Sequence, residues 1–198
     1  MRPLAPLACT LLLAACGHGE PPANAPASAT TAAGQPVAAS SATSPEAQAS
    51  ATLARYDGYG DLRFGMDQKA FAEAWQGELK HLGSPGDACF YQTPKWVKTP
   101  SHFAFMFEGG RFVRYDVGTA RETAPGGGRV GMDTAQVRAL YGARVSEGPH
   151  KYVPGARVLR VTAPQGAGVL VFETDAQGRV TRWRAGMPPQ VDYVEGCG

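Results

Sequence analysis

The sequence predicts an α+β protein with two tandem repeats, each of which is a short helix followed by two to three antiparallel strands. The tripeptide Gly-Met-Asp occurs at residues 65–67 and again at residues 131–133, and the apolar residues that follow both copies have the same spacing. Segments that alternate between apolar and polar residues, which are typical of strands, come after each copy. We therefore expect one continuous or paired sheet with the helices on one face.

Each copy of the tripeptide marks the start of a predicted helix. Asp67 and Asp133 occupy N-cap positions, because an aspartate there can accept a backbone N–H of the first turn. Gln136 is spaced to complete a capping box with Asp133. Apolar residues at helical spacing follow, and we interpret them as core contacts rather than ligand contacts. They are Phe71, Ala74 and Trp75 in the first copy and Val137, Leu140 and Tyr141 in the second.

The strand predictions come from alternation around turn residues. Residues 103–108 and 112–117 alternate on either side of a Gly-Gly pair and predict a β-hairpin. Residues 169–173 and 180–185 predict a second hairpin, and a further strand at residues 158–162 precedes it. Each half of the chain is therefore expected to end in antiparallel strands.

The passages between each helix and its hairpin contain Gly and Pro and are expected to be irregular. They include residues 91–94 in the first repeat and residues 152–154 in the second. On this division, repeat 1 covers residues 55–124, and repeat 2 together with a C-terminal tail covers residues 125–198. Neither repeat contains the strand–helix–strand crossover that a parallel sheet requires.

The N-terminal residues have the pattern of an export signal. Arg2 precedes an apolar run of about ten residues, too short for a lasting membrane span, which needs roughly 20. The run ends in Leu-Ala-Ala-Cys, which resembles the lipobox of bacterial lipoproteins. This resemblance implies a signal peptide at residues 1–15, acylation of Cys16 and a lipid anchor in the membrane. The alternative is an ordinary signal peptide in which Cys16 is incidental.

Gly17 stands where enteric lipoproteins retained in the inner membrane carry an aspartate. The resemblance therefore implies a lipid anchor in the outer membrane, with the folded part in the periplasm or at the cell surface. Residues 16–54, which start at the lipidated cysteine, are rich in Ala, Ser, Thr and Pro and have almost no large apolar side chains. Because such a segment cannot bury a core, we expect a disordered tether.

Two cysteines, Cys89 and Cys197, remain for the folded part once the signal peptide and the lipidated Cys16 are set aside. Export places them in a compartment that permits disulfides, so we expect them to pair. Closing a loop of about 100 residues stabilises a fold by roughly 4.7 kcal/mol in the chain-entropy model. The alternative, a reactive or metal-binding thiol, lacks a Cys-x-x-Cys or Cys/His motif to support it.

The tripeptide that opens a short helix, followed by a meander of strands on a tethered lipoprotein, resembles the small BamE-like assembly lipoproteins. Two such units in tandem resemble the β-lactamase inhibitor protein scaffold. The resemblance covers residues of about 60 to 186 and implies a scaffold that binds protein surfaces with its sheet and loops. No binding residue can be carried over from either family.

The sequence offers no recognisable catalytic, cofactor or metal motif. The four histidines are isolated, and no serine elbow, phosphate-binding loop or His-Glu-x-x-His helix occurs. The net charge is only +2 and both signs are interspersed, so we expect no nucleic-acid partner. Glu108 and Glu173 match across the repeat, and we interpret them as solvated acids beside turns. We expect no catalysis, no cofactor and no metal.

Strand alternation predicts one candidate binding surface. If the inner residues of the closing strands are Val113, Tyr115, Val117, Thr181, Trp183 and Ala185, the charged residues between them lie on the opposite face. That face would be open, rich in arginine and suited to a protein partner, an anionic glycan or a lipid headgroup. The alternative is an ordinary solvated face. The candidate residues are Phe112, Arg114, Asp116, Arg182 and Arg184, with Val180 among them.

These observations favour a membrane-anchored envelope lipoprotein that acts as a protein-binding module of the inhibitor, assembly or immunity type. Two alternatives remain: an envelope enzyme of hydrolytic activity, and a structural spacer between the cell wall and the outer membrane. A concave pocket that gathers Glu, His and Ser from both halves would favour the enzyme. A smooth sheet with exposed Arg and aromatic residues would favour binding.

Overall fold

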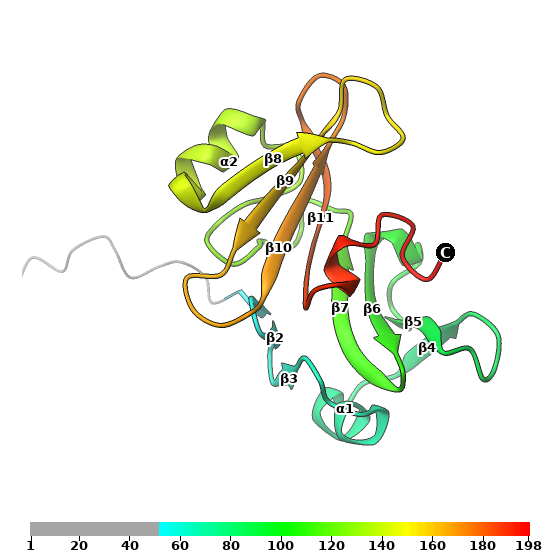
Figure 1. Cartoon of the computed structure of the whole chain (residues 1–198). Coiled ribbons are helices and arrows are strands. Elements are labelled where there is room, and N and C mark those ends of the chain that lie inside the picture. The colour runs from blue at the N-terminus through cyan, green and yellow to red at the C-terminus, as the bar shows by residue number, and fades with distance from the viewer. Residues whose placement is uncertain (1–51) are drawn as a thin grey trace, which may run out of the picture. The chain divides into compact units, whose positions relative to one another are not determined.

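The computed structural model describes residues 52–198 (Figure 1). The predictions of a signal peptide at residues 1–15, of lipidation at Cys16 and of nearly all of the tether lie outside the described residues. Neither helix within residues 52–198 has the length and apolar character needed to cross a membrane. The described chain is an α+β protein with few helices and an antiparallel sheet of eight strands.

Both predicted helices are present, and both begin at their predicted caps. In α1 (Gln68–Trp75), the Asp67 carboxylate accepts a hydrogen bond from Ala70 N at 2.9 Å. In α2 (Thr134–Tyr141), Asp133 Oδ1 accepts from Gln136 N at 2.8 Å, while Gln136 Oε1 accepts from Asp133 N at 2.9 Å. The capping box predicted for α2 is therefore confirmed.

The main sheet has the strand order β4-β5-β6-β7-β11-β10-β9-β8, and every neighbouring pair is antiparallel. The strands β6, β7, β9, β10 and β11 were expected from alternation. Four strands of the first half are followed across the sheet by four of the second half in reverse order, so the two halves meet at β7 and β11. The eight strands are β4 (Leu79–Leu82), β5 (Cys89–Pro94), β6 (Phe103–Glu108), β7 (Arg111–Val117), β8 (Val145–Pro149), β9 (Arg157–Thr162), β10 (Val169–Thr174) and β11 (Val180–Gly186).

Three strands occupy passages that the sequence led us to expect as irregular. Residues 91–94 are part of β5, and β4 and β8 lie at the two edges of the sheet. Edge strands pair through their backbones and need not alternate, because neither of their faces must be fully apolar. Residues 152–154 do lie in a loop, between β8 and β9. Each half thus has four strands of the main sheet rather than two to three.

The Gly-Met-Asp segments make matching contacts in the two halves. Gly65 N donates to Phe112 O at 2.7 Å, and Gly131 N donates to Val180 O at 2.8 Å. Both glycines have a positive φ, of 90° and 93°, which residues with a side chain rarely adopt. Each segment therefore connects the start of a helix to the closing strand of its own half.

A small sheet of three strands precedes α1 and packs on the first half. It consists of β1 (Ala54–Arg55), β2 (Gly58–Tyr59) and β3 (Leu62–Arg63). The Tyr59 ring lies 4.9 Å from the Phe103 ring between centroids. Tyr115 on β7 donates its hydroxyl proton to Arg55 O at 2.9 Å. These contacts tie β1 and β2 to the main sheet.

Both helices and the small sheet cover the same face of the main sheet. Phe71 of α1 lies 5.1 Å from Phe105 and 5.0 Å from Phe112 between ring centroids, and Tyr141 of α2 lies 5.6 Å from Phe172. These side chains belong to one buried cluster that runs through both halves. The expectation of helices on one face is therefore confirmed.

The opposite face is crossed by the C-terminal residues 187–198, which we call the C-terminal strap (red in Figure 1). Val191, in the 3-10 helix η3 (Gln190–Asp192), packs against Val169 and Val171 in a second, smaller apolar cluster. The strap ends at Cys197, which forms a disulfide with Cys89 of β5, and the two Cα atoms are 5.4 Å apart. The predicted pairing is confirmed.

We predict that Phe71→Ala lowers the free energy of unfolding by about 3–5 kcal/mol, because a fully buried aromatic ring is replaced by a cavity. Denaturant unfolding followed by circular dichroism measures this change. Lys69→Ala, on the exposed side of the same helix, is the matched control and should shift stability by less than about 0.5 kcal/mol. Equal effects of the two substitutions would contradict the assignment of α1 as a core element.

Candidate functional site

The predicted open arginine face is not open at most of its candidate residues. Phe112, Arg114 and Arg184 are almost fully buried, so the prediction is wrong for these three. A register shift opposite Met106 and Phe107 leaves Val113 without a partner and interrupts the alternation of β7. Phe112 consequently joins the helix-covered core instead of lying beside Arg114, because a bulge reverses the faces of the residues that follow it.

A second register shift, between Glu173 and Thr174, changes the predicted faces of β11. Val180 and Trp183 both belong to the helix-covered core. In a regular strand, residues three positions apart would lie on opposite faces. Val180 was expected among the charges and Thr181 in the core, and both expectations are wrong, since Thr181 is exposed. Arg182 remains on the opposite face, as predicted.

Arg114 and Arg184 are buried because the C-terminal strap lies over them. Arg114 Nη1 donates to Gln190 O at 3.0 Å and to Tyr193 O at 2.6 Å, and Arg184 Nε donates to Val191 O at 2.6 Å. Sequence alternation can assign a residue to a sheet face, but it does not indicate which distant segment covers that face. This explains why the burial of the two arginines was missed.

Two carboxylates neutralise these arginines. Asp116 Oδ2 accepts from Arg114 Nε at 2.9 Å. Glu173 accepts from Arg184 Nη1 through one oxygen and from Arg182 Nε through the other. The sequence interpretation of Glu173 as a solvated acid is wrong, since only 1% of its side chain is exposed. A signal was available, because Glu173 follows the continuous apolar run 169–172, which is typical of a strand buried on both faces.

The ion pairs determine the charge states at the site. Burial raises the pKa of Glu173, but Arg184 and Arg182 outweigh burial and hold that pKa below its ordinary value. Burial lowers the pKa of Arg114, and the adjacent Asp116 more than offsets this effect. Burial, together with the neighbouring Arg114, lowers the pKa of Arg184. Glu173 is thus held as an anion between two guanidinium groups.

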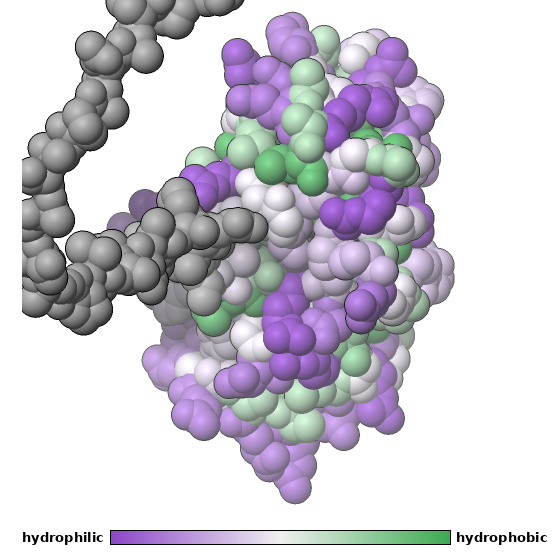
Figure 2. Space-filling view, turned by 90° about the vertical axis from the view of Figure 1, so that its left-hand side faces the viewer, coloured by the Kyte–Doolittle hydropathy of each residue, from purple (hydrophilic) through white to green (hydrophobic). Residues whose placement is uncertain are grey.

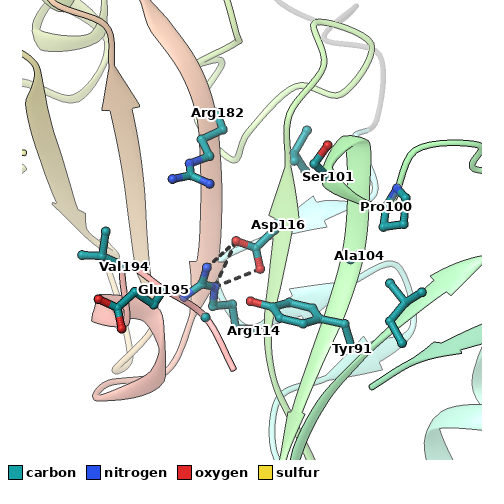
Figure 3. Close-up of a pocket in the computed structure, with 12 residues that line it drawn as sticks. Tyr91, Pro100, Ser101, Ala104, Arg114, Asp116, Arg182, Val194 and Glu195 are labelled. Atoms are coloured by element: carbon teal, nitrogen blue, oxygen red, sulfur yellow. Dashed lines mark hydrogen bonds and ion pairs between the residues drawn. The ribbon is translucent and has the colours of Figure 1, made fainter. Parts of the chain in front are cut away.

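Two hollows adjoin this charged network, and Ser101 and Arg182 line both of them. The first, of about 200 Å³, lies between β5, β7 and the strap. Figure 3 shows its Arg114–Asp116 ion pair at the centre, with Tyr91 on one side and the strap residues Val194 and Glu195 on the other. The second, of about 390 Å³, lies between the 3-10 helix η1 (Pro100–His102) and the β8–β9 loop. We call the two together the sheet groove.

Exposed aromatic side chains lie on two loops, one that leads into η1 and one that lines the second hollow. Trp96, between β5 and η1, is 67% exposed, and Tyr152, in the β8–β9 loop, is 52% exposed. The same β8–β9 loop supplies Val153 to the second hollow. On the side of the domain that carries α2 and β8, hydrophilic residues separate small hydrophobic patches (Figure 2).

The second hollow gathers Ser101, His150 and Glu173, the combination that would favour an enzyme. His150 Nδ1, however, accepts from Tyr152 N at 3.1 Å and from Val153 N at 3.2 Å. The other ring nitrogen, Nε2, lies 3.4 Å from Glu173 Oε2. Both nitrogens are engaged, so His150 has none available to take a proton from Ser101.

No group of three or more His, Cys, Asp or Glu side chains within residues 52–198 could hold a metal ion. The acids of the groove instead pair with arginine. The disulfide between Cys89 and Cys197 leaves no free thiol in the described part of the chain. The lining of the groove consists of charged, hydroxyl-bearing and apolar side chains.

We predict that Glu173→Gln destabilises the fold by about 3–5 kcal/mol near pH 7, because it leaves Arg184 buried without a full counter-charge. The pKa of Glu173 is lowered by folding, so its contribution is complete above the unfolded pKa and is lost as the pH falls through the folded one. The difference between wild type and variant should therefore shrink below about pH 5.

Denaturant titrations from pH 7 to pH 3 test this expectation. Glu78→Gln, at an exposed acid that pairs with Lys95, is the control and should have little effect at any of these pH values. A wild-type to Glu173→Gln difference that stays constant with pH would contradict the assigned charge state.

Neither a protein-family model nor a curated protein matches the chain. One solved structure is similar, an extracellular protein containing an SCP domain from Bacillus anthracis str. Ames. The TM-score is 0.40 at 10% sequence identity, over 63% of this chain and 44% of that chain. The chain thus spans less than half the length of this neighbour, and a similarity of this degree supports no inference about fold or function.

Proposed function

We propose that the chain is an envelope lipoprotein, anchored in the outer membrane through acylated Cys16, whose folded part is a protein-binding module. The observation that carries this proposal is the position of Arg182. Its side chain is 50% exposed at the junction of the two hollows, while its Nε is held by the buried Glu173. A guanidinium fixed in this way is ready to bind a partner's carbonyl or carboxylate groups.

The rigidity of Arg182 favours binding. Ordering a free side chain on association costs about 0.5–1.5 kcal/mol. The hydrogen bond to Glu173 already orders Arg182 before a partner binds, so less conformational freedom is lost on binding. Within residues 52–198, no hydrogen bond engages Nη1 or Nη2 of Arg182, so these two groups remain free to donate to a partner. Arginine is among the residues that most often dominate interface energies.

The exposed aromatic loops favour a protein partner in particular. Trp96 and Tyr152 present large rings to solvent on loops that end at η1 and at the second hollow. Aromatic residues are enriched at protein interfaces, where they bury much area at low cost in conformational freedom. An arginine between such loops resembles a hot spot with apolar surroundings.

An envelope enzyme is the second candidate, because Ser101, His150 and Glu173 line one hollow. The hydrogen bonds of His150 weigh against it, since they leave no nitrogen to activate Ser101. Asp116 and Glu173 are likewise paired with arginines and are poorly suited to act as general bases. The arrangement supports recognition better than catalysis.

We also propose that the two halves are diverged copies of one unit. The matching bonds of Gly65 and Gly131 support this origin, as do the two bridges between a helix cap and the start of a closing strand, Asp67 with Arg111 and Asp133 with Arg179. The binding surface then belongs to parts that differ between the copies, such as the strap and the β8–β9 loop.

Replacing Cys16 by Ser should move the protein from the membrane fraction to the soluble fraction, because the acyl chains would have no attachment site. Cell fractionation and metabolic labelling with a palmitate analogue measure this change. Cys9→Ser is the control and should keep both the label and the membrane association. Continued labelling of Cys16→Ser would contradict the proposed anchor.

Photo-reactive residues placed at Trp96 or Tyr152 should crosslink the same envelope protein in intact cells, since both positions are exposed on loops that lead to residues lining the groove. Arg182→Gln should reduce this crosslinking at least tenfold, the effect of losing about 1.4 kcal/mol of binding. A photo-reactive residue at Lys69, exposed on α1, should not capture that protein.

Arg157→Gln is the matched control, because Arg157 is also half-exposed and pairs with an acid, Glu147. It should leave the crosslinks unchanged. Equal capture with Arg182→Gln and Arg157→Gln would contradict the assigned role of Arg182. Crosslinks to cell-wall glycan alone would instead favour a structural spacer.

A further inference from the structure

We infer that the sheet face beneath the C-terminal strap is a second polypeptide-binding surface, which the strap itself occupies. This surface becomes available to a segment of the same chemistry from another protein when the Cys89–Cys197 disulfide is reduced. The inference goes beyond the sheet groove, because it concerns the contacts under the strap and specifies what kind of segment they recognise.

The first argument is that the surface binds the strap through its backbone. Arg114 donates to Gln190 O and Tyr193 O, and Arg184 donates to Val191 O. These oxygens lie within and just after the short helix η3. Gln190 O and Tyr193 O each also accept a backbone N–H of the strap, so the arginines use the second acceptor position that a carbonyl oxygen offers. Contacts to main-chain carbonyls select a turn conformation and do not require one particular sequence.

The second argument is that side chains of the strap have their own sites, among them Val191 and Asp192. Val191 is fully buried against Val169 and Val171. The next residue, Asp192, forms an ion pair with Arg160 of β9, with 3.0 Å between Oδ1 and Nε. The surface therefore fits a turn that carries an aliphatic residue followed by an acid.

The third argument is that the surface is preformed. Arg114 is held by Asp116 and Arg184 by Glu173, and all four residues lie on sheet strands rather than on the strap. The guanidinium groups thus keep their orientation when the strap is displaced. A preorganised site loses less conformational freedom when a ligand binds.

The fourth argument is that few hydrogen bonds run from the strap's backbone to the backbone of the sheet. Met187 N donates to Val113 O at 3.0 Å, and the backbone N–H bonds of Val191, Asp192, Tyr193 and Gly196 are made to the strap itself. The strap is consequently held by the arginine side chains that donate to its carbonyls, by its own side chains and by the disulfide near its end. Such a segment can leave without disrupting strand pairing.

The disulfide between Cys89 and Cys197 keeps the strap on the sheet. We call the protein latched while this bond is intact and unlatched when it is reduced or removed by mutation. While it is intact, the strap is present at a high effective concentration and excludes a competing segment. Both cysteines are partly exposed, so a dithiol reductant can reach them. In that exchange the Cys89–Cys197 sulfur–sulfur bond breaks, each sulfur gains a proton, and the reductant's two thiols become a disulfide.

The test uses the full-length chain and a fluorescent peptide with the sequence of residues 187–198, in which Cys197 is replaced by Ser. Binding is measured by fluorescence anisotropy to the oxidised protein, to the dithiothreitol-reduced protein and to the Cys89→Ser/Cys197→Ser variant. We expect the two unlatched forms to bind the peptide at least tenfold more tightly than the oxidised form does.

Changes in the peptide provide controls that cannot unfold the protein. A Val191→Asp peptide should lose binding, and an Asp192→Lys peptide should bind several-fold more weakly. Equal binding by latched and unlatched protein, or equal binding of the Val191→Asp peptide, would overturn the inference. Loss of the sheet on unlatching, seen by circular dichroism, would also overturn it, because the surface would then depend on the strap.

A further outcome concerns a second copy of the chain. If the unlatched protein forms a stable dimer by size-exclusion chromatography and does not bind the peptide, the strap exchanges between copies. The proposal of a separate partner would then be wrong. None of these outcomes depends on the crosslinking near Arg182, so the two proposals can fail independently.

Discussion

Four residue pairs join β7 to β11, from Trp183 opposite Val117 to Gly186 opposite Arg114, and they combine the two halves into one sheet. This pairing brings the aromatic core of the first half, through Tyr115, into contact with Trp183 of the second. It also places Asp116 opposite Arg184 on the other face. Without it, the core and the charged network would each be divided between two small units that bury too little surface to be stable alone.

The charged network has two opposing energetic effects. Removing Arg184 and Glu173 from water costs several kcal/mol for each ion, and their mutual attraction and hydrogen bonds offset this cost only while all partners are present. The strap supplies part of that compensation, because its carbonyl groups accept from Arg114 and Arg184. The position of the strap is therefore coupled to the charged network.

The same ion pairs support the proposal of recognition, rather than catalysis, at this site. Catalytic acids and bases need an available proton position and a pKa near the working pH. Here the pKa of Glu173 is held below its ordinary value by arginines, and both nitrogens of His150 are engaged. What remains available is the outer edge of the Arg182 guanidinium and the aromatic rings of the loops.

The sequence by itself determined the features that depend on near neighbours in the chain. The caps at Asp67 and Asp133 and the two hairpins follow from local spacing, and the Cys89–Cys197 pair followed from elimination together with export. Only the tertiary structure decided the faces of Phe112 and Val180 and the burial of Arg114 and Arg184. The physical reason is that a bulge shifts the side-chain alternation by one residue, and that the strap covering these charges lies far from most of them in the sequence.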